Sequence, residues 1–206
     1  LKQLVNMAAI KSVTRGTLKE VQKAVHREVS YTKGIKEVIE KKVKEAQQNL
    51  LKNFEKHPVT AEISSGAKSS NLSGTLGGTG NLFTYIGFSS GDKPLASLRV
   101  LLEVYEIRYH HAKGRTTINI TVPTTAELFK ATPMPWATGR SWAKGIETGI
   151  SGLGRYLYQD SAHSRSGGAV QVKGKLRSGK FSNTSYLSSL LNNYYKEIRK
   201  IEKQTI

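Results

Sequence analysis

The sequence predicts an α+β fold in which helices flank a small antiparallel sheet, with a long N-terminal helix and a C-terminal amphipathic helix. Apolar residues recur every three or four positions along residues 35–56, and they do so again along residues 187–201. Between these helical stretches, apolar and polar residues alternate over residues 116–122. Such alternation indicates a strand with one buried face.

The N-terminal part of the chain predicts two helices. Residues 1–34 are expected to form an arm whose helix begins at Thr17, with Glu20 completing a capping box, and which residues 31–34 interrupt. The second helix spans residues 35–56 and ends before His57–Pro58, because the residue before proline disfavours helical geometry. Its apolar stripe reads as a core face rather than a membrane-binding or calmodulin-type surface, since charges of both signs surround it. The stripe consists of Ile35, Val38, Ile39, Val43, Ala46, Leu50 and Phe54.

The middle of the chain predicts a long loop followed by a hairpin. Residues 59–63 are expected to be extended, 64–80 to form a loop long enough to suggest a function, and 82–88 to form a buried strand. Pro94 is expected to start a helix that reaches Glu103. Residues 104–110 and 116–122 predict a hairpin around a turn at 112–115.

The remaining elements are shorter. A helix capped by Thr124 and Glu127 is expected to reach Lys130, followed by a loop over 131–140. Residues 141–158 predict a helix interrupted by glycines, and 169–172 a short strand. Asn183 or Thr184 is expected to cap the last helix. The predicted organisation is an arm (1–34), an α+β core domain (35–181) and a C-terminal helix (182–206).

Charge is the strongest compositional signal. The 206 residues carry a formal net charge of +17, from 32 Lys and Arg against 15 Asp and Glu. Such a field favours nucleic acid, an acidic membrane face or an acidic protein surface as partner. The chain has no cysteine, which excludes disulfides and thiolate metal sites. Its apolar runs fall short of the roughly 18 residues of a membrane span, so we expect no membrane partner.

No catalytic, cofactor or metal signature is present, and we expect that the protein is not an enzyme. The glycines of residues 74–80 lack the lysine of a phosphate-binding loop and do not open a predicted helix. His110 and His111 point to opposite faces of a predicted strand and cannot chelate one metal from it. Glu147 is the one acid near Trp142 and Arg140, where it could form an ion pair but would act alone in catalysis.

A basic and aromatic segment is the best candidate for binding. Residues 130–180 contain nine Lys or Arg and two acids, with aromatic side chains interleaved in the first part. This pattern suits contact with a nucleic-acid backbone with base stacking, and it equally suits a protein interface rich in Trp, Tyr and Arg. The candidate residues for an interface or a basic lumen are Trp136, Arg140, Trp142, Lys144, Arg165, Lys173, Lys175, Arg177 and Lys180.

Two stretches resemble neck and tail-completion proteins of long-tailed bacteriophages, which join the head to the tail. They are HPVTAEISSG…NLSGTLGGTGNLFTYIGF, preceded by a Lys/Glu-rich helix, and PWATGRSWAKGIETGISGLGRYLY followed by SRSGGAVQ. The resemblance covers about residues 35–172. Within it, residues 73–76 correspond to a Thr/Ser-Gly-x-Leu core found in the loop of that family.

The resemblance implies a structural virion protein that forms a ring of six or twelve copies between portal or adaptor and tail proteins. It implies localisation in the virion neck or tail, after assembly in the host cytoplasm. The loop residues expected at the interface between copies are Ser73, Gly74, Thr75, Leu76 and Asn81. Non-specific contact with DNA in the lumen remains open for the basic residues. The alternative hypothesis is a sequence-independent nucleic-acid-binding protein.

Overall fold

The computed structural model describes residues 20, 21, 24, 29–76, 80–112, 115–135, 137–149, 157–158, 170–171 and 181–203. Within these residues the helices are α2 (Val29–Lys56), α3 (Pro58–Ser64), the 3-10 helix η2 (Gly66–Lys68), α4 (Leu82–Ile86), α5 (Ala96–Glu103), α6 (Thr125–Lys130), α7 (Trp142–Thr148) and α8 (Leu187–Lys203). The strands are β1 (Glu106–Ala112), β2 (Arg115–Thr121), β3 (Pro133–Met134), β4 (Ala137–Ser141), β5 (Leu157–Tyr158) and β6 (Val170–Gln171). The α+β class is confirmed.

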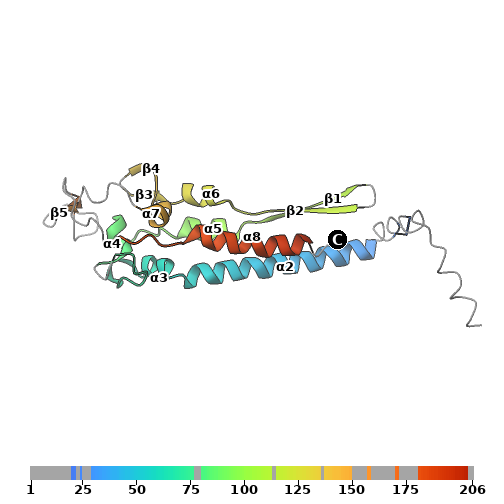
Figure 1. The fold of residues 1–206 in the computed structure, drawn as a ribbon, viewed down its shortest axis with the longest axis horizontal. Coiled ribbons are helices and arrows are strands. Elements are labelled where there is room, and N and C mark those ends of the chain that lie inside the picture. Colours follow the sequence, from blue (N-terminus) through green and yellow to red (C-terminus); the bar gives the residue numbers. More distant parts are fainter. Residues whose placement is uncertain are drawn as a thin grey trace, which may run out of the picture.

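Helices α2 and α8 run antiparallel along the long axis of the molecule (Figure 1). Their apolar stripes face one another, as the sequence periodicity predicts. The buried residues of the two stripes are Ile39, Val43, Ala46, Leu50 and Phe54 on α2, and Leu187, Leu191, Tyr194, Ile198 and Ile201 on α8. Helix α8 therefore belongs to the same core as α2.

Two details of the α2 prediction are wrong. The expected interruption at residues 31–34 is absent, because α2 runs without a break from Val29. Gly34 costs an isolated helix only about 1 kcal/mol, and cooperative extension of a long packed helix outweighs that cost. Val38, assigned to the apolar stripe, is 54% exposed on the outer side of α2. The expected cap at Thr17 lies outside the described residues.

Two segments predicted as extended are short helices instead. Residues 59–63 belong to α3, in which His57 is the N-cap and Pro58 occupies the first helical position, where its missing N–H is not needed. Residues 82–86 form α4. Asn81 caps its first turn, and Gly87 ends it in the left-handed conformation with φ 92°. Both corrections arise because a short apolar run does not by itself distinguish helix from strand.

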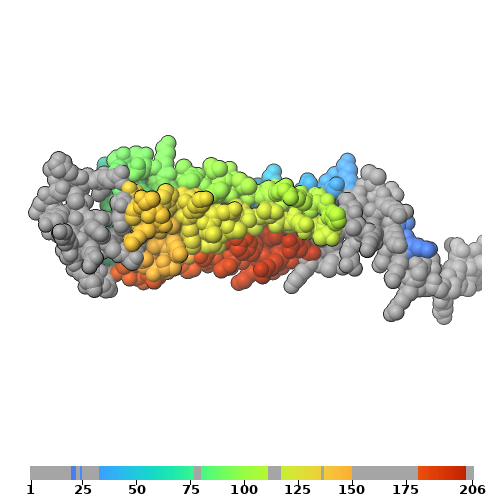
Figure 2. All heavy atoms as spheres, turned by 90° about the horizontal axis from the view of Figure 1, so that it is seen from above, coloured from blue at the N-terminus to red at the C-terminus, as the bar shows by residue number. Residues whose placement is uncertain are grey.

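The hairpin prediction is confirmed, although Ala112 and Arg115, expected in the turn, are paired strand residues. Strands β1 and β2 pair antiparallel, with Ile107 opposite Ile120 and Tyr109 opposite Ile118. These four side chains share one face and pack, half-buried, against the core. Helix α5, which precedes the hairpin, begins at Ala96 rather than at Pro94. Figure 2 shows the hairpin and α6 on one face of the molecule, with α8 in red along a long edge.

The segment after the hairpin combines a confirmed helix with two corrections. The Thr124–Glu127 capping box of α6 is present as predicted. Residues 133–134 and 137–140, expected within a loop, belong to the paired strands β3 and β4, and Ser141, expected to begin a helix, is the last residue of β4. The helix expected over 141–158 ends at Thr148, because Gly149 adopts φ 94°, and residues 157–158 form strand β5 paired with β6. No helix among the described residues is both long and apolar enough to cross a membrane.

Candidate functional site

The loop between α3 and α4 is held by a buried carboxylate. Glu62 on α3 is fully buried, and one of its oxygens accepts a hydrogen bond from the Ser73 N–H at 2.7 Å. Its other oxygen accepts one from the Leu82 N–H, the first residue of α4, at 2.6 Å. Charge-assisted bonds of this kind are stronger than neutral ones and replace the solvation that a buried carboxylate loses. Glu62 thus fixes the two positions, Ser73 and Leu82, that flank the glycine-rich part of the loop.

The side chain of Asn81 also holds this loop in place. Its Oδ1 accepts the Thr84 N–H at 2.9 Å, while its Nδ2 donates to the Ala67 and Ser69 carbonyls at 2.8 and 3.0 Å. The amide therefore joins the start of α4 to the end of η2. Together with Glu62, it explains why the glycine-rich loop has a defined path along its described residues.

This geometry corrects part of the interface prediction. Thr75, Leu76 and Asn81 are buried within the protomer, with exposed fractions of 0, 2 and 4%. Side chains already covered by their own chain contribute little contact area to a neighbouring copy. Ser73 is half-buried and Gly74 is exposed, so these two remain accessible among the five loop residues.

An extended strap, defined here as residues 181–186, docks against this end of the molecule before α8 begins. Phe181 stacks on Tyr85 of α4 with ring centroids 5.7 Å apart. The Ser182 N–H donates to the Thr75 carbonyl at 2.8 Å, and the Thr184 N–H donates to the Ile146 carbonyl at 3.1 Å. The strap therefore connects α4, the loop and α7 to α8.

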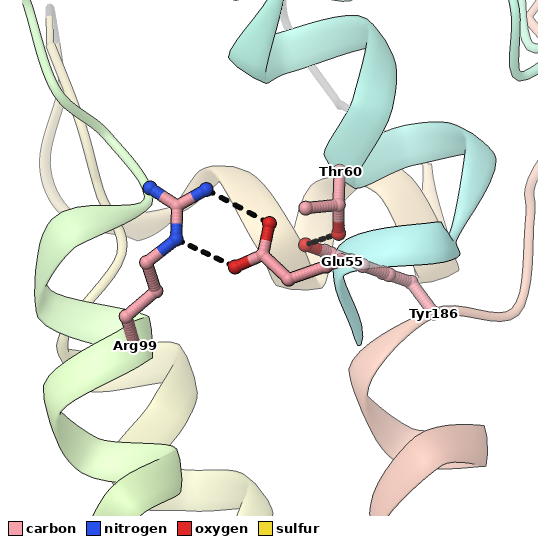
Figure 3. A network of polar contacts seen from close by, with 4 residues as sticks. All are labelled: Glu55, Thr60, Arg99 and Tyr186. Atoms are coloured by element: carbon pink, nitrogen blue, oxygen red, sulfur yellow. Dashed lines mark hydrogen bonds and ion pairs between the residues drawn. The ribbon is translucent and has the colours of Figure 1, made fainter. Parts of the chain in front are cut away.

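Tyr186, the last strap residue, anchors the start of α8. Its hydroxyl lies 2.8 Å from the Thr60 Oγ1 on α3 and its ring is fully buried, which raises the pKa of the hydroxyl (Figure 3). Beside it, Arg99 on α5 donates two hydrogen bonds to Glu55 on α2, at 2.6 and 2.9 Å. These bonds hold the pKa of Glu55 below its usual value. Because both side chains are partly exposed, this pair adds little stability.

Glu147 on α7 binds the first turn of α8. One carboxylate oxygen accepts the Ser188 N–H at 2.8 Å, and the other accepts the Ser188 hydroxyl. A negative charge at the first turn of a helix is favourable because it satisfies unpaired N–H groups and the helix dipole. The predicted caps, Asn183 and Thr184, lie too early in the chain, since α8 begins at Leu187. The carboxylate at the N-terminus of α8 is that of Glu147 on α7 instead.

His57 links α3 to the strap in its neutral form. Its Nδ1 accepts the Val59 N–H at 3.3 Å, which leaves the proton on Nε2, 3.2 Å from the Ser185 carbonyl. Its ring packs on Tyr186, with centroids 4.8 Å apart. Desolvation lowers the pKa of His57, an effect that the Ser185 carbonyl and the charge of Glu147 oppose. Protonation of Nδ1 would remove the hydrogen-bond acceptor that caps α3.

This geometry predicts a pH dependence of stability. A histidine whose pKa is lower in the folded state binds fewer protons there than in the unfolded chain. The stability it confers is therefore complete above its unfolded pKa of about 6.5 and is lost as the pH falls below it. In urea titrations from pH 7.5 to 5, His57→Asn, which retains a capping acceptor, is expected to reduce this loss by up to about 1 kcal/mol. A His57→Asn variant whose stability changes with pH as much as that of the parent protein would contradict the assignment.

The structure brings together two of the predicted basic residues. Arg140, at the end of β4, and Lys144, in the first turn of α7, are exposed and line one hollow of about 270 Å³. Trp142 lies between them in sequence but is 1% exposed, so its place among the binding residues is corrected: it is a core side chain. The remaining candidates lie outside the described residues; they are Trp136, Arg165, Lys173, Lys175, Arg177 and Lys180.

Within the described part of the chain, no group of three or more His, Asp or Glu side chains is placed to hold a metal ion. Four of its acids accept hydrogen bonds from backbone N–H groups: Glu62, Asp92, Glu127 and Glu147. The pairing of Glu127 with Thr124 was visible in the sequence as a capping box. The roles of Glu62 and Glu147 were not, because their partners lie 11 to 41 positions away.

Comparison with protein-family models, curated proteins and solved structures finds no match to this chain.

Proposed function

We propose that this protein is a structural subunit of a tailed-bacteriophage virion. It forms a homo-oligomeric ring of six or twelve copies in the neck or tail-completion position, where it contacts portal or adaptor and tail proteins. The resemblance of residues 35–172 to neck and tail-completion proteins supports the phage assignment. The protein would be located in the virion after assembly in the host cytoplasm.

The β1–β2 hairpin carries the assembly part of the proposal. Each strand has seven residues, and among the described residues neither strand pairs with a third one. Both outer edges therefore present backbone N–H and C=O groups that a strand of another copy can pair. Pairing of β1 in one copy with β2 in the next is a head-to-tail contact, which closes into a ring when the rotation between copies is suitable.

The first test is the mass of the purified protein by multi-angle light scattering, at low and high salt. A discrete hexamer or dodecamer is the expected result. A monomer that gains mass only when DNA is added would favour the alternative, a sequence-independent nucleic-acid-binding protein. A ring of the expected mass does not by itself identify its interface, so a second experiment addresses the hairpin.

Cross-linking tests the hairpin contact, because the chain has no cysteine of its own. Single variants Arg108→Cys on β1 and Asn119→Cys on β2 lie opposite each other on the exposed face of the hairpin. Mixed and treated with a short bis-maleimide, they should form covalent dimers containing one copy of each variant. Lys52→Cys, exposed on α2, is the control. Yields no higher than those of the control would reject the hairpin as the interface.

A further inference from the structure

Two hollows adjoin at the loop between α4 and α5. The first, called here the lysine hollow, has a volume of about 420 Å³ and extends from η2 to the start of α5. The second, called the proline hollow, has a volume of about 370 Å³ and extends from the same loop to residues 131–135. Asp92, Lys93 and Pro94 line both of them. A ligand that crosses this loop can therefore contact both hollows.

The lysine hollow carries two unpaired cations. Lys68, the last residue of η2, and Lys93 both line it, and both are exposed. Within the described part of the chain, neither ammonium group forms an ion pair. Arg99 lines the hollow as well, but its guanidinium is bonded to Glu55. Two like charges in one hollow repel each other, so a ligand that brings negative charge to both lysines is favoured.

Asp92 adds a hydrogen-bond acceptor to the same lining. Its Oδ2 accepts the Ser89 N–H at 2.7 Å, while its Oδ1 has no partner among the described residues. A peptide backbone offers N–H donors to such an oxygen, whereas a phosphodiester backbone has none. The combination of two ammonium donors with a carboxylate acceptor therefore fits an acidic peptide better than a nucleic acid.

The proline hollow is suited to an apolar side chain. Pro94, Pro133 and Pro135 contribute ring surfaces to its lining, and proline has no backbone N–H to leave unpaired beneath a ligand. Its charged lining residues are Asp92 and Lys93, which it shares with the lysine hollow. An apolar side chain placed against the three rings is removed from water, which favours its binding.

We propose that the two hollows together bind a segment of a partner protein in which acidic side chains one or two positions apart lie next to an apolar one. The carboxylates contact Lys68 and Lys93, a backbone N–H of the segment donates to Asp92, and the apolar side chain enters the proline hollow. The partner is not a second copy, because no two of the 15 acidic residues in this chain are closer than three positions. The proposal goes beyond ring formation and does not depend on it.

The test is fluorescence anisotropy with a labelled synthetic peptide of about ten residues that contains adjacent glutamates flanked by leucines. The double variant Lys68→Gln/Lys93→Gln is expected to weaken binding about tenfold at low salt, because two charge-assisted contacts are lost. Both lysines are exposed, so the variant should keep the stability of the parent protein, which urea denaturation checks. Unchanged affinity in this variant would overturn the proposal.

The matched control is Lys41→Gln/Lys44→Gln, which removes the same charge from exposed positions on α2. Lys44 lies about 16 Å along the helix axis from Glu55, the partner of Arg99 at the lysine hollow. Charges further away than a Debye length of about 10 Å are largely screened at 0.1 M salt, so the control should change affinity by less than about twofold. Equal losses in the two double variants would overturn the proposal in favour of diffuse attraction.

Changes in the probe test the proline hollow without altering the protein. A peptide with serine in place of each leucine should bind about tenfold more weakly, because the apolar contact is lost. Equal binding of the two peptides would overturn the role of the proline hollow, and no binding of the leucine peptide at millimolar concentration would overturn the whole proposal.

Two further measurements separate this proposal from the other functions. Duplex DNA that displaced the peptide as effectively as unlabelled peptide of equal charge would overturn the peptide assignment in favour of nucleic acid. Light scattering of Lys68→Gln/Lys93→Gln reports on the ring independently. Weakened peptide binding with an unchanged mass, whether that of a ring or of a monomer, supports the peptide site.

Discussion

Replacement of Glu62 by alanine is expected to lower the free energy of unfolding by about 2–4 kcal/mol. The change leaves the buried N–H of Leu82 and the partly buried N–H of Ser73 without their acceptor, since Glu62 is fully covered. Each unpaired buried donor costs about 1–3 kcal/mol, and removing the carboxylate's own desolvation cost offsets a part. Urea denaturation measures the difference.

The exposed Glu45 on α2 provides the control for this experiment. Glu45→Ala should change stability by no more than about 0.5 kcal/mol, as surface substitutions usually do. Hydrogen exchange adds a local readout, because the amides of Ser73 and Leu82 should lose protection in Glu62→Ala first. If Glu62→Ala and Glu45→Ala unfolded at the same urea concentration, Glu62 would not be the residue that holds the loop.

Replacement of Trp142 by alanine is expected to cost about 3–5 kcal/mol, the usual range for removing a large aromatic side chain from a core. The indole packs edge-on against Phe88, with centroids 5.9 Å apart, and at 6.4 Å from Tyr186. Its backbone N–H also donates to the Thr132 carbonyl at 2.8 Å, a bond that the substitution retains. The loss is therefore one of packing, measurable by thermal or urea denaturation.

Val100→Ala is the comparison for Trp142→Ala, because Val100 is an apolar residue that is 64% exposed. It should change stability by less than about 0.5 kcal/mol. If Trp142 belonged to an interface instead, its replacement would lower the mass of the assembly while leaving the stability of the monomer unchanged. That combination of results would contradict the core assignment.

The burial of Leu76 makes the substitution Leu76→Asp unsuitable as a test of assembly. Leu76→Asp would place a charge among core residues, where the side chain is 2% exposed. A failure to assemble would then follow from a folding defect and would not identify an interface. Gly74 is exposed and takes φ 69°, so it too is unsuitable for bulky substitutions. The exposed strands of the hairpin are better positions for testing assembly.

The sequence predicted those elements whose signal extends over many residues. The stripes of α2 and α8 repeat over several turns, and the alternation in β2 spans seven residues, so both periods could be read directly. The capping box at Thr124 was equally explicit, because both partners are three residues apart. Local patterns of this kind are independent of the rest of the fold.

The errors concern short apolar runs and long-range partners. Residues 82–86, LFTYI, are mostly apolar and too short to show a helical or a strand period. Only the flanking residues, Asn81 and Gly87, indicate a capped helix. The basic hollow could not be predicted, because it requires β4 and α7 to meet at a glycine-rich corner. The sequence did identify Arg140 and Lys144 by their charge, but it could not reveal that the tryptophan between them faces the core.

The pairing of α2 with α8 also has a consequence for how the chain folds during synthesis. The apolar stripe of α2 is complete once Lys56 has been made, yet its partner begins at Leu187, about 130 residues later. Contacts so distant in sequence form slowly, because a long loop must close before they can stabilise anything. While the intervening residues are being made, the face of α2 that packs on α8 is therefore without that partner, and exposed apolar surface of this kind favours premature association.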